Sequence, residues 1–149
     1  MINEALKLRG NLAMVLRDKD GNVKETREEK NLVVSAGLNF ICDRMEGTSE
    51  AVMSHMAVGS GTTAAAAGNT DLESILGSRE ALDSTTVTDN TITYVSSFEA
   101  GEGTGAITEA GIFNASTAGT MLCRTVFSVV NKAADDTLQI TWTITLSAS

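Results

Sequence analysis

The chain of 149 residues contains no proline, one tryptophan, one tyrosine, one histidine and two cysteines. No apolar run is long enough to cross a bilayer, and no signal peptide precedes the first predicted strand. The sequence therefore predicts no membrane partner and synthesis in the cytoplasm. Cys42 and Cys123 are far apart and lie in apolar settings. This pattern predicts two buried, reduced thiols rather than a disulfide or a metal site.

Basic residues are also scarce. The chain has 11 Lys and Arg against 19 Asp and Glu, which gives a formal net charge of −8. Such a chain repels nucleic-acid phosphates, and it carries no Lys/Arg stripe that would bind them. Nucleic acid is therefore excluded as a partner.

No motif for catalysis, cofactor binding or metal binding survives inspection. Asp18 and Asp20 have the spacing of carboxylates in a calcium loop, but such a loop has its glycine at the sixth position, and here that position is not glycine. The stretch Asp18–Asn22 instead predicts a hairpin turn. His55 is the single candidate general base, yet Gly59-Ser60-Gly61 does not have the spacing of a nucleophile elbow. The same glycines lack the lysine of a phosphate loop. We expect His55 to be a half-buried sheet residue, which leaves a small hydrolase as a remote alternative.

The strongest feature that is present is the stretch Thr137–Leu146. Its apolar residues alternate strictly with polar ones and include the single tryptophan, Trp142. Period-2 alternation with β-branched and aromatic residues predicts a strand with one buried face. That face needs a second layer to cover it.

Several other segments also predict strands: Ala5–Arg17, Val52–Val58, Thr91–Phe98, Ala106–Phe113 and Met121–Phe127, with a weaker one at Arg79–Val87. Val23–Lys30 is almost entirely polar and is predicted as the return strand after the turn at Asp18–Asn22. The series predicts an all-β fold: a single antiparallel β-sandwich domain over residues 1–149, jelly-roll-like, with the strand order left open. The predicted core is Leu12, Met14, Leu16, Ile92, Phe98, Ile112, Val126, Ile140, Trp142 and Ile144. Charges on both faces of Val23–Lys30 predict an edge strand.

One or two short helices interrupt this series. Leu38–Met45 has apolar residues at helical spacing (Leu38, Ile41, Cys42 and Met45), and Ser35 is a plausible cap. We expect this helix to pack across an open end of the sandwich. Thr70–Leu76 predicts a second helical turn. Gly10 and Gly111 predict a bend or break in their strands.

Two stretches resemble structural proteins of tailed-bacteriophage particles. The first is Gly10–Met45, with its strand, Asp-x-x-Gly-Asn turn, polar strand and helix. The second is discontinuous and comprises His55–Thr63, Ile107–Asn114, Thr120–Phe127 and Thr141–Thr145. Similar segments occur in phage head decoration, cement and tail-appendage proteins. The resemblance implies a non-enzymatic virion component without cofactor or metal, assembled in the host cytoplasm.

The sequence contains no fibrous repeat and no long heptad coil, which favours a compact decoration protein over a fibre. The expected role is a capsid decoration or cement protein that binds the major capsid protein and stabilises the head. A short tail or baseplate adaptor, or fibre-attachment domain, that binds tail proteins is the alternative. Because decoration proteins often sit on threefold axes, the resemblance implies a homotrimer, with a homodimer as the second possibility.

Attachment is expected through non-strand segments, because the sandwich core is needed for the fold. The candidates are a short N-terminal arm at residues 1–8 and the small-residue loop at residues 59–76. The predicted contact residues are Met1, Ile2, Asn3, Leu6, Thr62, Thr63, Ala64, Ala65, Ala66, Ala67 and Asn69. The alternatives are a frayed terminus and a disordered solvent loop, since so few apolar side chains do not offset the entropy of ordering.

Overall fold

The computed structural model describes residues 5–47 and 50–148 of the chain. It is 54% strand and 8% helix, which confirms the prediction of an all-β fold with one short helix. The elements are β1 (Leu6–Arg17), β2 (Val23–Val33), α1 (Ser35–Glu46), β3 (His55–Gly59), β4 (Glu80–Ala81), β5 (Ser84–Thr88), β6 (Thr91–Phe98), β7 (Gly105–Phe113), β8 (Met121–Lys132) and β9 (Thr137–Ala148). Within the described ranges, no helix is long and apolar enough to span a membrane.

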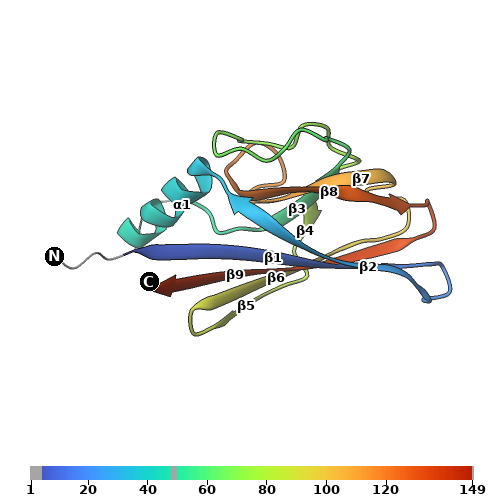
Figure 1. The fold of residues 1–149 in the computed structure, drawn as a ribbon, viewed down its shortest axis with the longest axis horizontal. Coiled ribbons are helices and arrows are strands. Elements are labelled where there is room, and N and C mark those ends of the chain that lie inside the picture. Colours follow the sequence, from blue (N-terminus) through green and yellow to red (C-terminus); the bar gives the residue numbers. More distant parts are fainter. Residues whose placement is uncertain (1–4, 48–49, 149) are drawn as a thin grey trace.

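The strands form one curled antiparallel sheet in the order β4-β3-β7-β8-β2-β1-β9-β6-β5. The sheet folds over so that two layers face each other, with α1 at one end (Figure 1). β2 joins the layers because it pairs with β1 along most of its length and with β8 only through Leu32 and Val33. The two-residue link Leu82–Asp83 connects the opposite margins of the sheet, β4 and β5.

The alternating stretch around Trp142 forms β9, which lies between β1 and β6. Trp142 is fully buried, and its Nε1 donates a hydrogen bond of 2.8 Å to Asn31 Oδ1. The predicted core is confirmed except at two positions: Ile92 and Val126 are only half-buried. β9 thus supplies the centre of the core, as its periodicity predicts.

The glycines inside strands permit close packing rather than bends. β1 pairs with β9 without interruption at Gly10, and the Asn31 side chain occupies the space that a Cβ on Gly10 would need. Gly111 likewise stays in register with Ala57 and Arg124. The predicted breaks at Gly10 and Gly111 are therefore wrong.

Helix α1 presents a different face from the predicted one. Gly37 packs directly against the carbonyl oxygen of Leu122 in β8. Gly37 and Phe40 face inward, and of the predicted face Ile41 packs half-buried against the core. Leu38 and Met45 are exposed, at 45% and 82%. The apolar spacing gave the wrong face because a glycine, which carries no hydrophobic signal, makes the closest contact.

The start of α1 and the exposure of Cys42 also differ from the sequence-based predictions. The N-cap residue is Val34, which makes no side-chain hydrogen bond, so Ser35 is the first helical residue and not the cap. Cys42 is exposed on α1, while Cys123 is buried in β8, and both thiols are free. The prediction of two buried thiols is therefore wrong for Cys42.

The polar strand β2 lies between β8 and β1 in the sheet, but the predicted edge segment, Val23–Lys30, pairs along its backbone with β1 alone. Along the part of β2 that does not pair with β8, side chains of β2 contact β8 and the turn that follows it. Arg27 Nη2 donates to the Val129 carbonyl oxygen at 2.8 Å, and Lys24 Nζ lies 2.7 Å from Asp136 Oδ2. These contacts connect Arg27 to β8 and Lys24 to the turn between β8 and β9.

Candidate attachment surface

The predicted arm and the predicted loop lie in different parts of the molecule. Met1, Ile2 and Asn3 lie outside the described residues. Leu6 opens β1, pairs with Ala148 and is 63% exposed. The arm is therefore a strand of the lower layer from residue 6 onward, whereas the loop covers the upper layer (Figure 1).

The loop at residues 59–76 is organised around a buried ion pair. Glu109 in β7 and Arg124 in β8 come from neighbouring strands, and their side chains are 0% and 2% exposed. Arg124 Nη2 lies 2.8 Å and Nε 3.0 Å from the same carboxylate oxygen, Glu109 Oε2. A buried carboxylate is stable only when it is paired and hydrogen-bonded, and the loop provides further donors.

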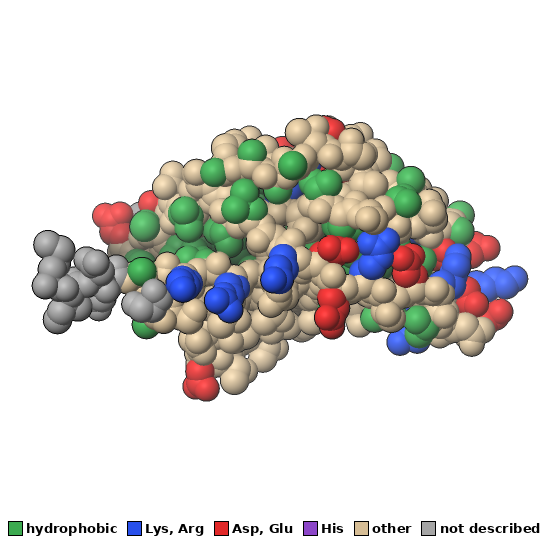
Figure 2. All heavy atoms as spheres, viewed as in Figure 1, with side chains coloured by type: hydrophobic (Ala, Val, Ile, Leu, Met, Phe, Trp, Pro, Cys, Tyr) green, Lys and Arg blue, Asp and Glu red, His purple; other side chains and the backbone are tan. Residues whose placement is uncertain are grey.

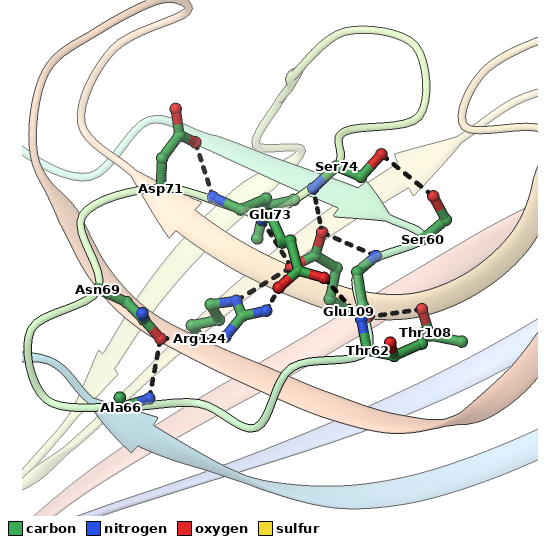
Figure 3. A network of polar contacts seen from close by, with 12 residues as sticks. Ser60, Thr62, Ala66, Asn69, Asp71, Glu73, Ser74, Thr108, Glu109 and Arg124 are labelled. Carbon is green, nitrogen blue, oxygen red and sulfur yellow. Dashed lines mark hydrogen bonds and ion pairs between the residues drawn. The ribbon is translucent and has the colours of Figure 1, made fainter.

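Three backbone N–H groups of the loop converge on the Glu109 carboxylate (Figure 3). Gly61 and Ser74 donate to Oε1 at 3.1 and 2.8 Å, and Glu73 donates to Oε2 at 3.0 Å. A Cβ on Gly61 would stand 2.6 Å from Oε1, so glycine allows the backbone to approach this closely. The carboxylate thereby ties both ends of the loop to the sheet.

The middle of the loop is held by Asn69. Its Oδ1 accepts hydrogen bonds from Arg124 Nη1 at 3.0 Å and from the Ala66 backbone N–H at 2.8 Å. The Ala67 carbonyl oxygen accepts a hydrogen bond of 2.8 Å from the Ser35 backbone N–H. The loop therefore has an internal hydrogen-bond framework, which its low-complexity composition does not suggest.

The segment Thr70–Leu76 is irregular and not the predicted helical turn. Leu72 is buried in a small cluster with Ala57 and Phe113, and Ile75 forms an isolated bridge with Gly59. Hydrogen bonds from Thr63 and Thr62 lower the pKa of Glu73. Contacts with the sheet thus override the helical spacing of Leu72, Ile75 and Leu76.

The outward side of the loop is small and uncharged between residues 62 and 69. Thr62, Thr63, Ala64, Ala66 and Ala67 are exposed, while Ala65 and Asn69 are half-buried. A shallow groove of about 330 Å³ separates the loop from the β2–β8 junction; it is lined by Lys30, Asn31, Leu32, Thr62, Ala64, Ala65, Arg124, Thr125 and Val126. The small side chains of residues 62–67 allow close approach of another protein backbone.

His55 lies half-buried in β3, and its Nδ1 is 2.8 Å from Ser54 Oγ. Both residues belong to the same stretch of chain, so the contact is local. Within residues 5–47 and 50–148, no three His, Cys, Asp or Glu side chains are grouped so that they could hold a metal ion.

Glu109 and Arg124 are the residues that sequence reasoning missed. Each is the single charged residue of its segment, Ile107–Phe113 or Met121–Phe127. Opposite single charges in two segments predicted as buried strands could have indicated an ion pair between them, because charged side chains are almost never fully buried unless they are paired.

No protein-family model, curated protein or solved structure matches this chain. The comparisons therefore provide no argument about family or function.

Proposed function

We propose that this protein is a non-enzymatic structural component of a tailed-bacteriophage particle, of the capsid decoration or cement class. It binds the major capsid protein through the loop at residues 59–76 and assembles as a homotrimer. The observation that carries the proposal is the pairing of an uncharged, small-residue outer surface with an inner hydrogen-bond framework on Glu109 and Arg124. The resemblance of the segments around it to phage structural proteins supports the same role.

The framework favours docking because it reduces the entropy lost on binding. A loop that is already ordered gives up less conformational freedom to a partner than a flexible one. The exposed methyl and hydroxyl groups of residues 62–67 present little steric hindrance to a flat protein surface. Backbone groups of the loop and partner then come close enough to bond.

Localisation on purified particles tests the proposal directly. Cys42 is exposed, whereas burial raises the pKa of the Cys123 thiol, so a maleimide label reacts at Cys42. Electron microscopy of particles carrying gold-labelled protein should place the label on the capsid. A label confined to the tail would overturn the decoration role and support the adaptor role.

A charged loop variant tests the attachment surface. Ala66→Glu combined with Ala67→Glu should fold normally and bind particles at least about tenfold more weakly. Ala134→Glu, at an exposed position in the turn before β9, is the matched control and should bind as the parent does. Equal binding by the loop variant would show that attachment lies elsewhere.

Among the residues that the structure describes, the contact between Ser54 and His55 is the feature that suggests hydrolysis. His55→Ala should leave particle binding unchanged, because we assign His55 no part in the attachment surface. A hydrolytic activity of the parent that disappears in this variant, with the fold intact, would contradict the non-enzymatic role.

A further inference from the structure

Strand β5 is an open edge of the sheet. It pairs only with β6, and all five of its residues, Ser84–Thr88, are exposed. Backbone N–H and C=O groups point alternately to the two sides of a strand. Some of the N–H and C=O groups of β5 therefore point away from β6. Proteins usually protect such edges with lysine, proline or a bulge, and β5 has none of these.

The core-side face of β5 is also uncovered. The register places Thr85 opposite Tyr94 and Val87 opposite Ile92, and directly opposite residues share a face of the sheet. Tyr94 is buried, so Thr85 and Val87 lie on the core side, yet Val87 is 67% exposed. The second layer therefore does not extend over β5.

Two hollows lie along this uncovered face and meet at Ile92. The first has a volume of about 330 Å³ and is lined by Phe40, Arg44, Val52, Met53, Thr85, Ile92 and Tyr94. The second, of about 200 Å³, is lined by Val87, Asp89, Asn90, Thr91, Ile92 and Leu146. An open edge beside an apolar groove is the arrangement that accepts an added strand, which bonds through its backbone and inserts alternate side chains.

We propose that β5 binds an extended segment of a partner protein, which adds one antiparallel strand to the sheet. Every second residue of that segment is apolar and packs beside Val87 and above the groove. Two exposed acidic residues, Asp83 and Asp89, flank the edge, and Asp83 Oδ2 also accepts a hydrogen bond of 2.7 Å from Ser97 Oγ in β6. Charge complementarity therefore requires a basic residue at each end of the segment.

The same carboxylates oppose pairing between two copies of β5. The antiparallel register with the longest overlap is centred on Thr86, and it places Asp83 of each copy opposite Asp89 of the other. Like charges directly opposite each other destabilise a strand pair. The occupant is therefore a different chain, and this site is separate from the loop at residues 59–76.

A designed peptide serves as the probe: fluorescein-labelled Lys-Thr-Val-Thr-Val-Thr-Lys amide, whose valines lie opposite Val87 and Thr85 when its lysines lie opposite Asp89 and Asp83. We expect saturable binding to the full chain by fluorescence anisotropy, together with slower amide hydrogen exchange within Ser84–Thr88. Replacing both peptide lysines by glutamate should weaken binding by about tenfold or more. No binding up to about 1 mM peptide, or no protection of β5, would overturn the proposal.

A pair of variants separates this site from general surface effects. Val87→Lys introduces a charge on the core-side face, at a position that is already exposed, and should weaken peptide binding by about tenfold or more. Thr86→Lys adds the same charge on the opposite face of β5 and should change binding by less than about threefold. Equal binding by both variants would contradict the groove. Sedimentation of the parent protein and of Val87→Lys gives a further test. If the parent is a dimer and Val87→Lys is a monomer, β5 pairs with a second copy of the chain, and the proposal of a partner segment is overturned.

Discussion

The Glu109 carboxylate holds both ends of the loop at residues 59–76 against the sheet, through the backbone N–H groups of Gly61, Glu73 and Ser74. Glu109 receives three backbone N–H groups and the Arg124 guanidinium, so Glu109→Gln leaves Arg124 as an uncompensated buried charge. We expect a loss of about 3–5 kcal/mol in the free energy of unfolding. Denaturant titration measures the loss, and faster amide exchange over residues 59–76 should accompany it. Glu28→Gln, at an exposed position in β2, should change stability by less than about 0.5 kcal/mol.

Trp142 provides the largest fully buried side chain of the core. Trp142→Ala removes its packing and its bond to Asn31, so we expect a loss of about 3–5 kcal/mol in thermal or denaturant unfolding. Val23→Ala, at a position that is 52% exposed, serves as the control. A loss well under about 1 kcal/mol for Trp142→Ala would contradict the tight packing around β9.

Tyr94 should make the protein sensitive to alkali. Burial raises the pKa of Tyr94 from 10.0 to about 12. As the pH rises, the Tyr94 hydroxyl ionises in the unfolded chain before it ionises in the folded protein. The free energy of unfolding is therefore unaffected by this ionisation below pH 10 and falls as the pH rises from 10 towards about 12. Two pKa units correspond to about 2.7 kcal/mol. Tyr94 is the single tyrosine, so its ultraviolet absorbance reports the titration. Tyr94→Phe should remove the Tyr94 contribution and leave that of the Cys123 thiol, whose pKa burial also raises.

At the scale of elements, local periodicity was sufficient for most strands. Thr91–Phe98 was predicted with the bounds of β6, and Thr137–Leu146 lies within β9. These segments are half-buried in the regular way that period-2 alternation describes. The interior place of β2, between β8 and β1, was not predictable, because its neighbour β8 lies about 100 residues further along the chain.

The candidate site was less predictable than the fold. Composition identified the loop at residues 59–76, but not its order, because that order depends on Glu109 and Arg124 in distant strands. The face of α1 was missed for a related reason: it depends on the close approach of Gly37 to β8. Contacts between segments far apart in sequence leave little local pattern.

Gly37 offers a test of that approach. Gly37→Ala places a methyl group against the Leu122 carbonyl oxygen, so α1 must shift away from β8. We expect a loss of about 1–3 kcal/mol, although alanine is the better helix former. Gly68→Ala, where a Cβ would have no atom within 4 Å and the backbone angle is unstrained, should be nearly neutral in the same unfolding assay. A stabilising effect of Gly37→Ala would contradict the close approach.

For the whole molecule, the distribution of charge distinguishes ionic from close-packed attachment. The net charge is −8, but charged side chains gather along the β1–β2 side in this view, while the upper surface is largely uncharged (Figure 2). Raising the salt concentration from about 0.1 M to about 1 M shortens the Debye length from roughly 10 to 3 Å. Attachment through the uncharged residues 62–67 should therefore persist when particles are washed at the higher concentration.

The protein retained on sedimented particles measures this directly. Sodium sulfate and sodium chloride at matched ionic strength provide the control, because sulfate strengthens apolar burial while both salts screen charges. We expect no more than about twofold loss in chloride and none in sulfate, since close contacts between small side chains do not depend on screening. Release in both salts would mean that the contacts are ionic. In that case the charged strand β2 at Val23–Lys30, and not the loop at residues 59–76, would be the surface to substitute next.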